Sequence, residues 1–139
     1  MFTLDTNTIS YYFRGDQHVV PRLQALGPAE VTVPAIVIYE LRYGLLRLNS
    51  KASASRLSAL ETLVRPLQIL TFDQQCADAA AAIRVALEKR GEPIGPHDLL
   101  IAATALRHGA TLVTRNVREF SRIKALKVVN WHAKDDQES

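Results

Sequence analysis

Short apolar runs alternate with longer helical segments along the sequence, and this alternation limits the fold more than any other feature. The runs are rich in β-branched residues and lie at 2–5, 31–33, 67–72, 111–114 and 126–131. Each run is continuously apolar rather than alternating with polar residues, which is typical of parallel strands that are buried on both faces. We therefore predict a single three-layer α/β/α domain with a mostly parallel central sheet.

The helical segments between these runs begin and end at recognisable signals. Gly15, the Gly27-Pro28 pair, Pro66 and Gly109 mark helix ends, and Asp73 stands where the N-cap of a long alanine-rich helix belongs. The expected helices cover 7–14, 17–26, 35–48, 52–65, 74–90 and 97–109, with one short helix within 115–123. The domain is expected to occupy 1–132, and the tail 133–139 is expected to be disordered.

Composition excludes several classes of protein. No window reaches about 18 apolar residues, and no basic segment precedes a long apolar one, so the sequence predicts neither a membrane span nor a signal peptide. The single cysteine, Cys76, excludes an internal disulfide and a thiolate metal cluster, which fits a reducing cytoplasm. The net charge of +3 permits contact with a polyanion without demonstrating it.

Polar residues collect where the predicted strands end. Ligand sites in open parallel sheets lie beyond the carboxyl ends of the strands. Asp5 ends the first strand, and Asn116 and Glu119 follow the fourth. Asp98 lies in the first turn of the helix that leads to the fourth strand, and Glu40 lies about two turns into the helix after the second. We therefore expect these side chains to meet at one edge of the sheet.

Each acid taken alone has an ordinary structural explanation. Asp5 would cap the helix that follows it, and Asp98 would stabilise the dipole of its own helix. Glu40 would lie on a narrow solvated stripe. Together, however, the three carboxylates would repel one another and raise one another's pKa unless a cation were bound. Oxygen ligands without cysteine, and without histidines at metal-ligand spacing, suit Mg²⁺ or Mn²⁺.

Four motifs in this order resemble the PIN-domain ribonucleases, and among them the VapC toxins of bacterial toxin–antitoxin pairs. The motifs are LDTNTISYYF, AIVIYELRYG, IGPHDLLIAATAL and LVTRNVREF, and they extend over almost the whole chain. The resemblance implies a PIN-like fold in which Asp5, Glu40 and Asp98 are catalytic acids that bind the metal. The hydroxyls of Thr6 and Thr114 are expected near this site.

The resemblance departs from the family pattern at Asn116. Many PIN domains have an aspartate at this position, whereas this chain has an amide, as in one VapC subgroup with a similar N-x-x-E-F segment. Glu119 lies three residues further on. If the turn is helical, Glu119 shares a face with Asn116 and restores the missing charge. Both residues are therefore counted as catalytic candidates, and the number of metal ions stays open.

The activity that the resemblance implies is metal-dependent hydrolysis of an RNA phosphodiester to a 3′-hydroxyl and a 5′-phosphate. A metal ion would make hydroxide available at neutral pH. The basic cluster around Asn116 would bind RNA phosphates; it consists of Arg115, Arg118, Arg122 and Lys124. The family implies a homodimer, a VapB-like antitoxin that inhibits the enzyme, and a structured RNA such as tRNA as target.

Three other functions remain open from the residues alone. DTNT is superficially similar to the D-x-D-x-T signature of haloacid-dehalogenase-like phosphotransferases, although Asn7 replaces the second aspartate. A receiver-like domain would be phosphorylated on an aspartate after the third strand, where Asp73 lies. In a non-catalytic module that binds RNA or protein, the carboxylates would be structural.

Overall fold

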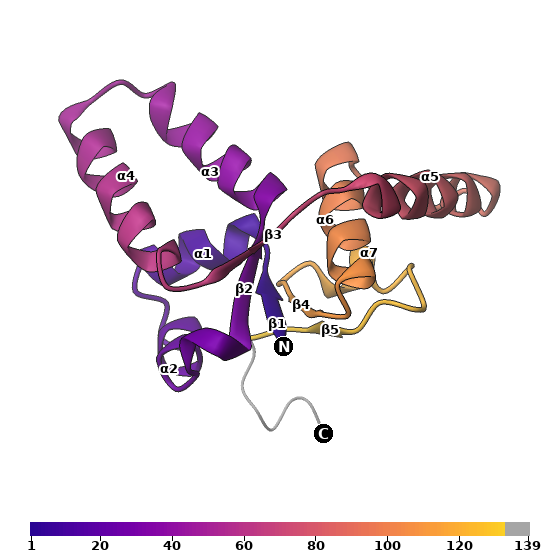
Figure 1. Ribbon diagram of the computed structural model, residues 1–139, viewed down its shortest axis with the longest axis horizontal. Coiled ribbons are helices and arrows are strands. Elements are labelled where there is room, and N and C mark those ends of the chain that lie inside the picture. Colours follow the sequence, from indigo (N-terminus) through magenta and orange to yellow (C-terminus); the bar gives the residue numbers. More distant parts are fainter. Residues whose placement is uncertain (133–139) are drawn as a thin grey trace.

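A five-stranded parallel sheet forms the centre of the computed structural model, which describes residues 1–132 (Figure 1). The strands are β1 (Phe2–Leu4), β2 (Val31–Pro34), β3 (Gln68–Leu70), β4 (Thr111–Val113) and β5 (Val128–Val129). Their order in the sheet is β3-β2-β1-β4-β5, and all four neighbouring pairs are parallel. The predicted parallel α/β architecture is therefore confirmed.

Helices flank the sheet and connect its strands. They are α1 (Thr6–Phe13), α2 (Val19–Gln24), the 3₁₀ helix η1 (Pro28–Glu30), α3 (Ala35–Leu46), α4 (Lys51–Val64), α5 (Gln74–Lys89), α6 (Pro96–Arg107) and α7 (Val117–Phe120). Figure 1 shows α3 and α4 side by side as a hairpin on one side of the sheet, with α5 extending on the other. No helix within residues 1–132 is long and apolar enough to cross a membrane.

Several elements are shorter than the sequence indicated, including β3, which was predicted at 67–72, and two of them have a local cause. The helix predicted at 17–26 spans only Val19–Gln24. Its start is delayed because Oδ1 of Asp16 accepts hydrogen bonds from the amides of His18 and Val19. The strand predicted at 126–131 is reduced to Val128–Val129, because the amide of Leu126 is bonded to the carbonyl of Ile123 in a turn. The predicted disorder of 133–139 lies outside the described residues.

Apolar side chains of the central strands are buried under the flanking helices. Leu4, Val33 and Leu112 have no exposed surface. Ile9 of α1 and Val37 of α3 are equally buried and belong to the same core cluster. Burying a side chain of this kind contributes about 1.5–3 kcal/mol. The centre of the sheet is consequently a rigid base for whatever the strand ends carry.

The strand order places a topological switch point beside β1. From β1 the chain moves outward through β2 to β3, and it later enters β4 on the other side of β1 and continues to β5. The two directions part at the carboxyl ends of β1 and β4, where the amide of Asp5 donates to the carbonyl of Val113 over 3.2 Å. Open parallel sheets bind ligands at such points.

Candidate active site

Asp5 caps helix α1 from a buried position at the end of β1. Its Oδ1 accepts a hydrogen bond from the amide of Thr8 at 2.8 Å, so the predicted N-cap is confirmed. Only 5% of the residue is exposed. Burial raises the pKa of Asp5 above its ordinary value, and hydrogen bonding from Thr114 and Thr8 acts in the opposite direction. The capping oxygen is thus occupied, and the carboxylate is held at the switch point.

Asp98 lies in the first turn of α6, and the pKa of its carboxyl group is strongly raised. Burial is the main cause that raises its pKa from 3.8 to about 7. A hydrogen bond to Glu119, which requires Asp98 to keep its proton, is the next cause, followed by the negative charges of Glu119, Asp5 and Glu40. The structure therefore brings together four of the five predicted catalytic residues.

Glu119 lies partly buried on the short helix α7 and is the direct neighbour of Asp98 in this group. No N–H or O–H group of residues 1–132 reaches its buried Oε1. A buried carboxylate oxygen without a partner is costly. A proton shared with Asp98, or a bound cation, would remove that cost.

Glu40 is held by hydrogen bonds at both of its oxygens. The hydroxyl of Thr6 donates to Oε1 over 2.6 Å, and Nδ1 of His97 lies 2.9 Å from Oε2. Sequence reasoning expected Thr6 near the site but missed His97. The available signal was the place of His97 in the first turn of α6, directly before Asp98. These contacts fix the carboxylate of Glu40 between α1 and α6.

Asn116 is the N-cap of α7, so the turn after β4 leads into a helix as predicted. Its backbone amide donates to the hydroxyl of Thr114 over 2.9 Å, and no hydrogen bond from its side chain caps the helix. The side chain is exposed. The residue that lies against Asp98 is therefore Glu119, and Asn116 marks the start of the helix that carries it.

Two of the four basic residues around Asn116 contact different parts of the chain. Nη1 of Arg115 donates to the hydroxyl of Tyr11 over 2.7 Å, whereas Nη1 of Arg122 donates to the carbonyl of Pro93 over 2.8 Å. Arg118 and Lys124 are exposed. The cluster seen in the sequence is thus divided between two neighbourhoods in space.

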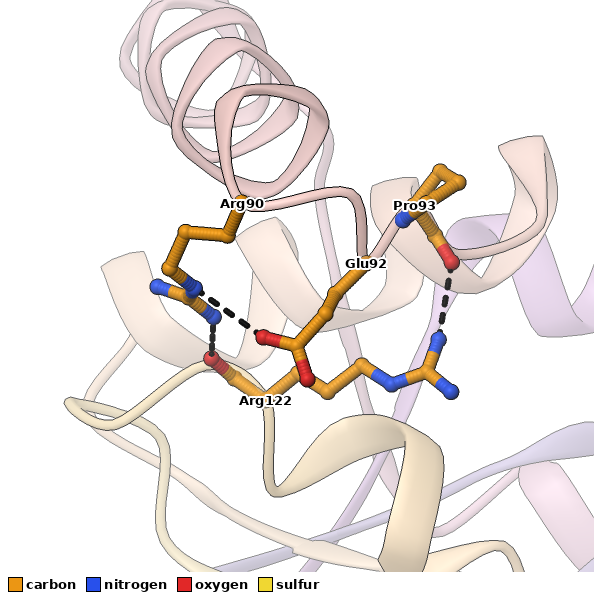
Figure 2. A network of polar contacts seen from close by, with 4 residues as sticks. All are labelled: Arg90, Glu92, Pro93 and Arg122. Atoms are coloured by element: carbon orange, nitrogen blue, oxygen red, sulfur yellow. Dashed lines mark hydrogen bonds and ion pairs between the residues drawn. The ribbon is translucent and has the colours of Figure 1, made fainter.

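Arg122 belongs to a hydrogen-bond network that joins the loop before α6 to the segment after α7 (Figure 2). Arg90 donates through Nη2 to the carbonyl of Arg122 over 2.6 Å and through Nε to Oε1 of Glu92 over 3.1 Å. Pro93 lies in the loop before α6, and Arg122 lies just after α7. The network therefore helps to hold α7 against the start of α6.

The oxygen donors at this site fit a hard divalent cation. Asp98 lies near other carboxylates, and no group among residues 1–132 forms a hydrogen bond with the buried Oε1 of Glu119. Within residues 1–132, no three or more histidine, cysteine, aspartate and glutamate side chains are already arranged to hold a metal ion. Mg²⁺ is usually held by only one or two protein carboxylates and keeps several waters. Asp98 with Asp5 or with Glu119 would supply such a pair.

Comparisons with known proteins show which proteins this chain is similar to. The family model described as PIN domain matches residues 2–126. The chain is 34% identical over 131 residues to the tRNA(fMet)-specific endonuclease VapC of Salmonella typhimurium, with 94% of this chain and 97% of that protein covered. It is 36% identical over 138 residues to toxin FitB of Neisseria gonorrhoeae, which covers 95% and 99% of the two chains.

Solved structures show the same fold. VapBC2 from Rickettsia felis bound to a DNA fragment from its promoter matches with a TM-score of 0.84 at 34% identity, covering 94% of this chain and 98% of that chain. FitAcB from Neisseria gonorrhoeae matches with a TM-score of 0.85 at 33% identity, covering 96% and 100%. Both likenesses extend over almost the whole chain.

Proposed function

The chain belongs to the PIN domain family, and from this premise we propose that it is a metal-dependent endoribonuclease toxin that a cognate antitoxin neutralises. The observation that carries the proposal is the crowding of Asp98 by Glu119, Asp5 and Glu40 at the switch point. A binding module has no need of such a costly arrangement, whereas metal-assisted phosphodiester hydrolysis does.

The proposed roles follow from how each residue is held. Asp5 and Asp98 bind the metal, Glu119 supplies the charge that Asn116 lacks, and Glu40 completes the negative site. When bound, a divalent ion lowers the pKa of water and so makes hydroxide available for attack on phosphorus. Thr6 and His97 orient Glu40, and Thr114 orients Asp5. We propose Mg²⁺, or Mn²⁺, as the ion.

The substrate and partners are proposed from the relatives. The Salmonella relative is named as a tRNA(fMet)-specific endonuclease, and we propose a structured RNA, tRNA in particular, as the substrate of this chain. The similar structures are toxin–antitoxin complexes, which supports a VapB-like antitoxin as the partner. A homodimer and a cytoplasmic location, where tRNA is found, are part of the same proposal.

Cleavage of tRNA by the purified protein tests the function directly. We expect cleavage with Mg²⁺ or Mn²⁺, none with a chelator, and 5′-phosphate ends. Asp98→Asn should lower the rate by orders of magnitude, since metal activation of water is lost. Asp78→Asn, which changes an exposed acid on α5, is the matched control and should cleave as the wild type does.

Growth and mass measurements distinguish the ribonuclease from a binding module and from a phosphotransferase or receiver-like domain. Expression of the wild-type chain alone should arrest bacterial growth, and expression of Asp98→Asn should not. Equal arrest by both would favour a binding module. A mass increase of one phosphoryl group after incubation with acetyl phosphate would instead favour a phosphotransferase or receiver-like domain.

A further inference from the structure

We propose that Tyr11, together with the guanidinium groups of Arg14 and Arg115 that lie over its ring, forms a phosphate-binding surface that holds the RNA beside the acid site. The inference rests on the proposed ribonuclease function and adds to it the groups that hold the substrate. Two of the three residues, Tyr11 and Arg14, lie outside the basic cluster that the sequence indicated.

The guanidinium groups of Arg115 and Arg14 both lie close to the aromatic ring of Tyr11. Cζ of Arg115 lies 5.5 Å from the ring centroid, and its Nη1 donates to the Tyr11 hydroxyl over 2.7 Å. Cζ of Arg14, the C-cap of the helix that carries Tyr11, lies 5.3 Å from the centroid. The electron-rich face of an aromatic ring attracts a cation at this distance. The ring therefore holds together two like charges that would otherwise separate.

Within residues 1–132, neither arginine forms an ion pair with a carboxylate. Among the residues that the structure describes, no salt bridge joins Arg14 or Arg115 to a carboxylate, whereas Arg42, Arg84 and Arg90 each have one. Both guanidinium groups belong to exposed residues, and Tyr11 uses only one of the five N–H donors of Arg115. Two guanidinium groups that lie over one ring and have no carboxylate partner among the described residues are suited to phosphate oxygens.

The surface is contiguous with the acid site. Arg115 follows Thr114, whose hydroxyl bonds with Asp5 and accepts from the amide of Asn116. Tyr11 lies on the helix that Asp5 caps, and its ring meets His132 edge-on at 4.6 Å between centroids. The pKa of His132 is lowered by burial, and the charges of Asp5 and Arg115 act on it in opposite directions. Asp5, His132, Tyr11 and Arg115 thus share one neighbourhood.

RNA is a better occupant for this surface than an acidic peptide. When one phosphodiester of an RNA strand lies at the acids, the neighbouring phosphates of the same strand lie just outside the site. Tyr11, Arg14 and Arg115 border the site on one side. The crowded carboxylates repel a polyanion, so cations on that side are needed to hold it there. Arg122 cannot serve in the same way, because Pro93 and Arg90 fix its position beside the loop before α6.

Salt-dependent RNA binding tests the proposal without cleavage. Asp98→Asn protein serves as background, and binding of a labelled tRNA is followed by fluorescence anisotropy over a salt series. Arg115→Gln and Arg14→Gln should each reduce the slope of log K against log salt by about 0.7–0.9. Arg115→Lys should restore the slope, and Tyr11→Leu should weaken binding with both charges still present. Arg65→Gln, an exposed arginine that ends α4, is the matched control and should leave the slope unchanged.

Cleavage kinetics supply the second measurement. In the active protein, Arg115→Gln should raise KM by several-fold with little change in kcat. Unchanged slopes in both arginine variants, with melting curves like the wild type, would overturn the proposal. So would variants that lose only antitoxin binding, because the surface would then serve the partner. If the wild type binds RNA with an arginine-dependent slope but does not cleave it, the ribonuclease function fails and the RNA surface stands.

Discussion

Asp98 is the residue at which the electrostatics of the site are concentrated. Burial and the proximity of Glu119 both disfavour its ionised form. The sequence predicted that acids would gather here and that like charges would raise one another's pKa. It did not predict which pair would be closest, because that depends on how α7 is held by Arg90, Pro93 and Arg122, residues with no pattern of their own.

Asp98→Asn should make the metal-free protein more stable at high pH. The pKa of Asp98 rises from 3.8 to about 7 on folding, so the stability it contributes is fully present below about pH 4 and is lost as the pH rises through 7. Asp98→Asn does not lose stability in this way, because an asparagine side chain does not ionise. We expect its free energy of unfolding at pH 8 to exceed that of the wild type by on the order of 1 kcal/mol, allowing for solvent screening.

Urea unfolding at pH 5 and pH 8 with a chelator measures this difference. The wild type should be weaker at pH 8 than at pH 5, and the variant should show a smaller change. Asp78→Asn should keep the pH dependence of the wild type. If Asp98→Asn were the less stable protein at both pH values, the carboxylate would have to be stabilised by a group that compensates for its burial.

Glu119 and Asn116 can be separated by activity. Glu119→Gln should reduce the cleavage rate by at least about tenfold, since it removes the buried charge beside Asp98. Asn116→Ala should have a smaller effect, because the contact recorded for Asn116 is made by its backbone amide. Single-turnover cleavage of tRNA at saturating protein measures both. The reverse order would mean that the amide side chain of Asn116 orients the metal or the RNA.

At the scale of elements, local signals predicted most helices to within a few residues. Asp73 caps α5 through a 3.0 Å bond to the amide of Cys76, as its position indicated. The hairpin between α3 and α4 turns through Asn49, which has a φ of 46°, and Ser50, which caps α4. The sequence was least accurate for the strand β5, which has only two residues because the amide of Leu126 is bonded to the carbonyl of Ile123 in a turn before it.

Helix α1 allows the structural and catalytic roles of Asp5 to be separated. Asn is as good an N-cap as Asp, so Asp5→Asn should keep the bond to Thr8 and the stability of the helix. Asp5→Ala should be less stable than Asp5→Asn by about 1 kcal/mol. Both should lose RNA cleavage. Thermal unfolding and cleavage assays on the two variants measure this; an active Asp5→Asn enzyme would contradict the proposed role in metal binding.

At the scale of the whole molecule, the apolar runs predicted a parallel sheet, and the rule for strand ends predicted where the site would lie. The residues could not give the order β3-β2-β1-β4-β5, since no local pattern specifies which strands are neighbours. For the same reason His97 and Tyr11 were not predicted as part of the site. Each contacts a residue that is distant in the sequence: His97 contacts Glu40, and Tyr11 contacts Arg115.

The intact fold should be stabilised by the metal it binds. A ligand that binds only the native state adds about 2.7 kcal/mol at one hundred times its Kd. Millimolar Mg²⁺ or Mn²⁺ should therefore raise the Tm of the wild type and of Asp78→Asn, but not that of Asp98→Asn. Differential scanning fluorimetry measures the shift. No change in the wild type with either ion would contradict the proposed metal site.

The late position of β4 in the chain bears on how the protein is made. Until Thr111–Val113 have been synthesised, β1 lacks one of its two neighbouring strands, and the amide of Asp5 has no carbonyl of Val113 to bond. A nascent chain that stops after α5 contains Asp5 and Glu40 but neither Asp98 nor Glu119. On the proposed roles of these acids, translation products that end before α6 lack two residues of the site, and cleavage of RNA requires synthesis of the chain through α7.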